Sequence, residues 1–250
     1  MKDVESLKFC DIDFNVVKFY EIYKRHGEKK LLICAPSGPG LATIYQDDQY
    51  KEALMNADYN IFDSGLFTLL LRISKISVVK YSGLYFFKDI IKSFKKNKED
   101  SYILVNPTND DSAVNDLYMQ TYAHKSNFKS YIAPIYDLGH VIDFDLLDIL
   151  NEKKPGFIII NIGGGIQEKL GSWLKERLNY NATIICIGAA ISFETKGQAS
   201  IPHFIDRFYM GWLARCIKKP SVFIPRYFRA LKFVGIFLKN KSNITVYYKN

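Results

Sequence analysis

Asp63 is the residue of this chain best placed to do chemistry. It directly follows the apolar run 59–62, and in an open parallel sheet ligands bind beyond the carboxyl ends of the strands. A carboxylate at such a position can take a proton from a hydroxyl group as a general base. It can equally cap the helix that follows, and its position alone favours the cap. The two roles are compatible only if a second group caps that helix.

Three other apolar runs are followed by small or glycine-rich residues that could bind a ligand. Ser37 follows the run 30–35, Gly188 follows the run 183–187, and Gly163, Gly164 and Gly165 follow the run 156–162. Glycines at a helix start let the backbone approach a diphosphate, although glycines after a strand often serve only a tight turn. The spacing is not GxGxxG, and the run 183–187 does not end in an acidic residue for a ribose. These residues therefore do not predict a nicotinamide-dependent oxidoreductase.

The acidic pairs and the histidines do not predict a metal site. Asp11 and Asp13, like Asp143 and Asp145, have the DxD spacing that metal-dependent sugar transferases use. The first pair lies inside an alternating strand and the second at a helix start, so we interpret both as structural. The four histidines show no HxxH or HExxH spacing. We therefore expect neither a metal ion nor another cofactor.

The positive charge of the chain is concentrated at its C-terminal end. After Asp206 the sequence has ten Lys or Arg residues and no Asp or Glu, whereas the whole chain has a formal net charge of +8. Large apolar residues are interleaved with these bases, which suits an anionic partner beside an apolar phase. A membrane surface is the first candidate, and phosphate-bearing substrates and nucleic acid are its rivals. The residues expected to contact the membrane are Phe228, Arg229, Lys232, Phe233 and Phe237, whereas Trp212 and Leu213 are expected to pack inward.

The composition is that of a packed globular protein, because 48% of the residues are hydrophobic and 15% are aromatic. The first residues have no apolar core, so we expect no secretory signal. No apolar run approaches the about 18 residues of a spanning helix. The four cysteines are scattered without a CxxC pair, which favours a reduced, cytoplasmic protein.

Strand-like and helical patterns alternate along the first 200 residues. The predicted strands are 7–14, 30–35, 59–62, 102–105, 129–133, 156–162 and 183–187, and the predicted helices are 40–56, 66–74, 86–95, 112–124, 143–151 and 167–178. This order predicts an α/β fold, with a Rossmann-like, mostly parallel sheet covered by helices on both faces. The strand 7–14 alternates more than the others, which is typical of an antiparallel edge or a hairpin. After residue 197 the alternation stops. We therefore expect a catalytic domain over 1–200 and a basic helical appendage over 201–250, with a short strand at 244–248.

The order of four segments resembles the WecG/TagA/CpsF family of glycosyltransferases (glycosyltransferase family 26) over residues 5–235. The segments are 42–64 with "ALMNADYNIFDS", 161–168 with "NIGGGIQE", 187–197 with "IGAAISFETKG", and 202–227 with "PHFIDRFYMGWLARCIKKPSVFIPRY". The resemblance implies a Rossmann-like core and a basic C-terminal appendage that docks on the inner face of the cell membrane. It also implies inverting, metal-independent transfer of a sugar from a nucleotide donor, commonly UDP-linked, to a polyprenyl-diphosphate-linked saccharide. The expected partners are thus the nucleotide-sugar, the lipid-linked acceptor and an anionic membrane, and not nucleic acid.

The resemblance also implies roles for individual residues. Asp63 corresponds to the proposed general base, and Gln167, Glu168, Arg215 and Arg226 fall on donor-binding positions. The sequence departs from the family pattern at several other positions, namely Ala35, Ser37, Ser64, Ser192 and Gly211. Two hypotheses follow: a transferase with its own donor specificity, or a non-catalytic nucleotide-binding or scaffold protein at the membrane.

Overall fold

The fold is built around one mixed β-sheet with helices on both faces. A computed structural model describes residues 3–137, 139–195, 228 and 230–249. Within these ranges the sheet has nine strands in the order β6-β5-β7-β8-β3-β4-β2-β1-β9. The strands are β1 (Val4–Phe9), β2 (Ile12–Asn15), β3 (Leu31–Cys34), β4 (Tyr59–Ile61), β5 (Tyr102–Asn106), β6 (Tyr131–Ile132), β7 (Phe157–Ile160), β8 (Thr183–Cys186) and β9 (Thr245–Tyr248). Only β1 runs antiparallel to its neighbours, so the expected mostly parallel α/β fold is confirmed.

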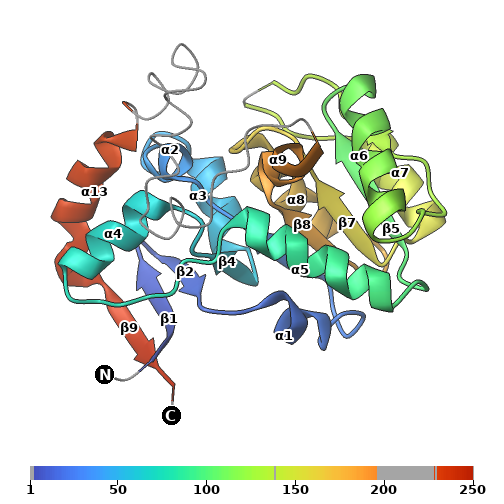
Figure 1. Ribbon diagram of the computed structural model, residues 1–250. Helices are drawn as coiled ribbons and strands as arrows, with labels where there is room; N and C mark the ends of the chain where they lie inside the picture. The colour runs from blue at the N-terminus through green and yellow to red at the C-terminus, as the bar shows by residue number, and fades with distance from the viewer. Residues whose placement is uncertain (1–2, 138, 196–227, 229, 250) are drawn as a thin grey trace.

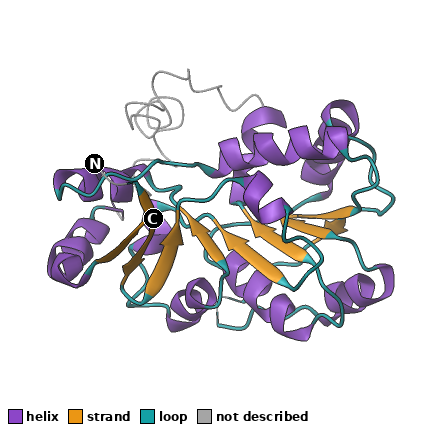
Figure 2. Cartoon of the chain, turned by 90° about the horizontal axis from the view of Figure 1, so that it is seen from below, coloured by secondary structure: helices purple, strands orange, loops and turns teal. Residues whose placement is uncertain are grey.

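The helices lie above and below the sheet (Figure 2). The α-helices are α1 (Phe19–Tyr23), α2 (Gly38–Leu41), α3 (Asp48–Met55), α4 (Gly65–Ile73), α5 (Gly83–Lys96), α6 (Asn109–Tyr122), α7 (Phe144–Lys153), α8 (Ile166–Arg177), α9 (Ser192–Thr195) and α13 (Lys232–Asn240); the 3₁₀ turns are η1 (Gly188–Ala190) and η2 (Lys241–Asn243). The prediction of a single helix over 40–56 is wrong, because this segment contains the end of α2 and then α3. The break has a local cause: Asp47 accepts the N–H of Tyr50 at 3.0 Å and so caps a new helix.

The central strands are buried on both faces, as expected for a parallel sheet. In β3, Leu32 and Cys34 pack with the side chains of α3, α7 and α8, whereas Leu31 and Ile33 pack with those of α5 and α6. All four residues of β7 are buried as well. The connections after β3 and β7 therefore leave on one face of the sheet, and those after β5 and β8 leave on the other.

The segment predicted as one strand over 7–14 is a hairpin. Strands β1 and β2 are antiparallel and meet at Cys10 and Asp11, whose φ angles of 52° and 68° are both positive. Two positive φ angles in a row are typical of the tight turn that matches the twist of a hairpin. Asp11 then pairs with Lys51 at 2.8 Å, and Asp13 pairs with Lys8 at 3.4 Å. The expected position of both residues inside one strand is wrong, because Asp11 lies in the turn and Asp13 in β2. The ion pairs are compatible with a structural role for this acidic pair, which stays a prediction.

The C-terminal segment is part of the main sheet (Figure 1). Strand β9 pairs with β1, with Lys8 opposite Thr245, so the expected short terminal strand is confirmed. The N–H of Lys249 also donates to the carbonyl oxygen of Asp3 at 2.9 Å, which joins the two ends of the chain. The proposed domain boundary near residue 200 lies outside the described residues and stays a prediction.

Candidate active site at the carboxyl edge of the sheet

The carboxyl ends of β4, β3, β8, β7 and β5 lie side by side along one edge of the sheet. After β7 the chain enters α8, which packs with α3 on one face of the sheet. The strands on either side of β7 lead to the other face. There, α6 follows β5 and packs with α9, and η1 follows β8 and packs with α5. Neighbouring connections thus diverge at β7. The carboxyl edge at such a divergence is where α/β proteins bind their ligands.

Asp63 lies at this edge and does not cap the helix that follows it. Ser64 caps α4 instead, because its Oγ accepts the N–H of Phe67 at 3.2 Å. The Oδ1 atom of Asp63 accepts the N–H of Gly83, the first residue of α5, at 2.8 Å. The carboxylate is half-buried and is held by a helix other than its own. The condition for a chemical role, that a second group caps α4, is therefore met.

Gln167 links the loops that follow β7 and β8. Its Oε1 accepts the N–H of Gly188 at 2.7 Å, and its Nε2 donates to Oε1 of Glu168 at 3.0 Å. Gly188 has a φ of +60°, and a Cβ added there would lie 3.5 Å from Nε2 of Gln167. The positive φ favours glycine at this position, whereas a contact of 3.5 Å would be an ordinary one. Gln167 therefore positions the two loops, and direct contact of Gln167 or Gly188 with a donor stays a prediction.

Glu168 is a buried carboxyl group at the start of α8. Its side chain is 1% exposed, and its Oε2 accepts the N–H of Gly165 at 2.6 Å, which caps the helix. Burial, opposed by hydrogen bonds from Gln167 and from the backbone and aided by the charge of Asp63, raises the pKa of Glu168 to about 7. Asp63 and Glu168 thus influence each other electrostatically although they follow different strands.

The triple glycine leaves open space above the N-terminus of α8. Among the described residues, no atom lies within 4 Å of a Cβ added at Gly163, Gly164 or Gly165, so packing against these residues does not require glycine there. Only Gly165 has a positive φ, of +92°. Backbone N–H groups and the helix dipole make the start of a 12-residue helix favourable for an anion. The open turn is compatible with a large anionic ligand such as a diphosphate.

Ser37 lies close to the Asp63 loop. Its Oγ accepts the N–H of Gly40 at 3.4 Å and caps α2. A Cβ at Gly38 would lie 3.1 Å from Oγ of Ser64, so the starts of α2 and α4 are in contact. The structure therefore brings Ser37 and Asp63 to one part of the edge, whereas donor contact by Ser37 stays a prediction.

Three buried asparagines at the same edge were not found by sequence reasoning. Asn106 ends β5, Asn161 follows β7, and Asn115 lies on α6. The Oδ1 atom of Asn106 accepts hydrogen bonds from Nδ2 of Asn115 at 2.8 Å and from Nδ2 of Asn161 at 3.2 Å. Asn106 and Asn161 each end an otherwise apolar run, "YILVN" and "FIIIN". An amide that interrupts such a run at its carboxyl end was the available signal.

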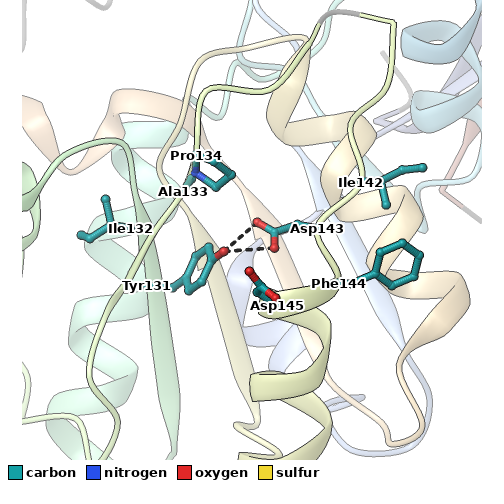
Figure 3. Close-up of a pocket in the computed structure, with 8 residues that line it drawn as sticks. All are labelled: Tyr131, Ile132, Ala133, Pro134, Ile142, Asp143, Phe144 and Asp145. Atoms are coloured by element: carbon teal, nitrogen blue, oxygen red, sulfur yellow. Dashed lines mark hydrogen bonds between the residues drawn. The ribbon is translucent and has the colours of Figure 1, made fainter.

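The DxD pair at Asp143 and Asp145 lies at a pocket beside β6 (Figure 3). Figure 3 shows the hydroxyl group of Tyr131 facing Asp143, with two hydrogen bonds of 3.0 Å. Asp143 also accepts from Tyr136 at 2.7 Å and from the N–H of Leu146 at 2.9 Å, and so caps α7. The interpretation of Asp143 as a structural residue at a helix start is confirmed. Over the described ranges, no three His, Cys, Asp or Glu side chains gather into a potential metal site.

The residues expected to contact a membrane divide into two groups. Phe228 is 73% exposed and Lys232 is exposed, as membrane contact would require. Phe233 and Phe237 are at most 1% exposed and pack against Phe67, with ring centroids 5.4 and 6.2 Å away. Membrane contact by Phe233 and Phe237 is therefore wrong, because they anchor α13 to the core. Arg215, Arg226 and Arg229 lie outside the described residues, and no described helix is long and apolar enough to cross a bilayer.

Comparisons with known proteins identify the family of this chain. The comparison with curated proteins found no match. Residues 7–245 match the Glycosyl transferase WecG/TagA/CpsF family, which is nearly the whole 250-residue chain and includes every strand from β2 to β8. The chain therefore belongs to the WecG/TagA/CpsF family, the glycosyltransferases of cell-surface polysaccharide biosynthesis.

Proposed function

We propose that this chain is an inverting, metal-independent glycosyltransferase that uses a UDP-linked sugar. In this proposal the acceptor is a saccharide linked to polyprenyl diphosphate, and the enzyme works at the cytoplasmic face of the membrane. The observation that carries the proposal is the release of Asp63 from capping α4: Ser64 caps that helix, and Asp63 is held at the ligand-binding edge by Gly83.

Asp63 is the proposed general base. The acceptor hydroxyl attacks the anomeric carbon from the side opposite the diphosphate, and its proton passes to the Asp63 carboxylate. The bond between the anomeric carbon and the diphosphate oxygen breaks, and the electron pair leaves with the nucleoside diphosphate. A single displacement of this kind inverts the anomeric configuration. Support comes from the half-buried position of the carboxylate and from the hydrogen bond that fixes it at 2.8 Å.

The start of α8 is the proposed binding site of the departing diphosphate. Developing negative charge is stabilised best by donors that are already oriented before the reaction. The open glycine turn supplies the backbone N–H groups of Gly163 and Gly164 and the positive end of a helix dipole, while the N–H of Gly165 is bound to Glu168. Glu168 holds this turn through the N–H of Gly165, and Gln167 binds Glu168 in turn and the N–H of Gly188. Arg215 and Arg226 are the proposed cationic partners of the same diphosphate.

The outward surfaces of α4 and α13 are the proposed membrane contact. The two helices pack on each other through Phe67, Phe233 and Phe237, and they lie at one end of the sheet (Figure 1). Exposed apolar side chains on this surface alternate with exposed basic ones. They are Leu69, Arg72, Ile73 and Lys75 on and after α4, and Phe228, Leu231, Lys232, Leu238 and Lys239 on and before α13. Apolar area and basic charge together favour an anionic bilayer.

The proposal is tested by turnover in the presence of a chelator. The full-length chain is incubated with individual UDP-sugars and a polyprenyl-diphosphate-linked saccharide in excess EDTA. We expect one donor to yield UDP and a glycosylated lipid whose new linkage has the opposite anomeric configuration to the donor. Retained configuration or loss of turnover in EDTA would contradict the mechanism. Absence of turnover with every donor, together with intact vesicle binding, would favour the scaffold hypothesis.

A further inference from the structure

The asparagine cluster of Asn106, Asn115 and Asn161 contains two buried polar atoms without partners. Each of the three side chains is at most 6% exposed. Among the residues that the structure describes, Nδ2 of Asn106 and Oδ1 of Asn161 have no hydrogen-bond partner. One is a donor and the other an acceptor, and they belong to neighbouring residues in the sheet. Buried polar atoms of folded proteins are nearly always paired, so this pair calls for an explanation.

The rest of the cluster is well bonded, so its geometry is fixed. Oδ1 of Asn106 accepts from both other asparagines, and Oδ1 of Asn115 accepts from the hydroxyl group of Thr195 at 3.2 Å. Val105 pairs with Ile160 in the register of β5 and β7, which places Asn106 beside Asn161. The two atoms without partners thus belong to side chains that are joined to each other by a hydrogen bond and cannot easily turn away.

The cluster lies where the connections of the sheet diverge. After β5 the chain passes to α6 on one face, and after β7 it passes to α8 on the other. One residue, Ile162, separates Asn161 from the open glycine turn. The cluster therefore lies directly beside the proposed diphosphate site, at a position where α/β sheets bind nucleotides.

The strand order places the cluster next to the glycine turn. The glycine turn follows β7, and Asn106 ends β5, the neighbouring strand about 4.8 Å away. A donor whose diphosphate lies at the glycine turn can therefore place its nucleoside over the ends of β7 and β5, beside Asn106 and Asn161.

The chemistry of the two atoms restricts what can bind there. The ligand must accept a hydrogen bond from Nδ2 of Asn106 and, through a neighbouring atom, donate one to Oδ1 of Asn161. The diphosphate of a nucleotide-sugar is esterified at both ends and fully ionised, so it only accepts and cannot pair with both. The imide edge of uracil has a carbonyl oxygen next to an N–H group and pairs with both.

We propose that Asn106 and Asn161 form the subsite for the base of the donor, and that they recognise the imide edge of uracil. The inference rests on the proposed function, since it requires a nucleotide donor at this edge. It adds that these two asparagines select the base.

The test compares three probes on the full-length chain: UDP, UDP methylated at N3 of uracil, and inorganic diphosphate. Methylation at N3 removes the N–H group that would donate a hydrogen bond to Oδ1 of Asn161. Loss of one buried hydrogen bond weakens binding about tenfold, so wild type is expected to bind N3-methyl-UDP about tenfold more weakly than UDP. Asn161→Ala is expected to bind UDP about tenfold more weakly than wild type and to bind both nucleotides equally, with its affinity for inorganic diphosphate unchanged.

Two further variants keep the result interpretable. Asn106→Asp keeps the oxygen that accepts from Asn115 and Asn161 but replaces the unpartnered donor, so it should also lose affinity for UDP and not for diphosphate. Tyr180→Phe is the matched control, because the hydroxyl group of Tyr180 is likewise buried without a partner but precedes β8 at the opposite edge. It should bind all three probes like wild type.

The outcomes separate the two proposals. If wild type binds UDP and Asn161→Ala and Asn106→Asp bind it equally well, the base subsite is wrong and the donor site stands. The base subsite is also wrong if wild type binds N3-methyl-UDP as tightly as UDP. It is wrong as well if the asparagine variants lose as much affinity for inorganic diphosphate as for UDP. If wild type binds none of the three probes, the proposed donor site itself is wrong, and the base subsite with it.

Discussion

At the scale of single residues, the carboxyl edge combines a half-buried carboxylate, Asp63, with a fully buried carboxyl group, Glu168, whose pKa is raised to about 7. Asp63 is half-buried and accepts from the start of α5, whereas Glu168 is fully buried under the glycine turn. The difference in environment decides their roles. A partly exposed carboxylate can receive a proton from a substrate, whereas the oxygens of Glu168 are occupied by Gly165 and Gln167.

The raised pKa of Glu168 predicts how stability depends on pH. Its pKa is about 7 in the fold against 4.5 ordinarily, so between these values the folded protein binds more protons than the unfolded one. The stability from this group is therefore fully present below pH 4.5 and is lost as the pH rises through about 7. The full effect is on the order of 3 kcal/mol.

Glu168→Gln removes this titration while an amide oxygen still accepts from Gly165. Urea unfolding at pH 5 and pH 8 measures the effect, because all other groups titrate alike in the two proteins. We expect wild type to lose more stability than the variant between the two pH values. The same pH dependence in both proteins would show that Glu168 does not titrate in this range.

At the scale of elements, α13 has one face in the core and one face outside. Phe233 and Phe237 are four residues apart and pack against β1 and α4, while Leu231 and Leu238 are 56% and 57% exposed. Phe9 and Phe67 form the other side of this aromatic contact. The buried pair thus fixes the orientation in which the helix presents its outer face.

This orientation predicts which side chains a membrane contacts. Leu231→Ser together with Leu238→Ser should weaken binding of the chain to vesicles of phosphatidylglycerol at least about tenfold, because each leucine loses apolar area that the bilayer would bury. Leu117→Ser on α6 is the matched control, since Leu117 is 64% exposed on another part of the molecule. Co-sedimentation with vesicles measures the effect. Equal binding by the double variant and the control would exclude this surface.

At the scale of the whole molecule, the sequence predicted the elements better than the contacts between them. The apolar runs of β3 and β7 and the glycine turn before α8 have local signals, and each lies where it was expected. The turn at Cys10 and Asp11 has no glycine or asparagine, so the exact end of β1 could not be predicted.

The rest of the candidate site depends on contacts between segments distant in the sequence. The hydrogen bond between Asp63 and Gly83 and the cluster of Asn106 with Asn161 each join different loops, so neither has a local signal. The inward position of Phe233 and Phe237 did have a local signal, because their spacing of four residues places them on one helix face. It was missed since the neighbouring basic residues suggested a membrane.

Asp63→Asn in a single-turnover assay is the measurement that tests the central claim most directly. The amide keeps an oxygen for the N–H of Gly83, so the melting temperature should stay that of wild type. If Asp63 is the base, the rate of sugar transfer should fall roughly 10²–10⁴-fold. Asp48→Asn, at an exposed position in the first turn of α3, should transfer sugar at the wild-type rate. A folded Asp63→Asn protein with the wild-type rate would contradict the account, because the base would then lie elsewhere.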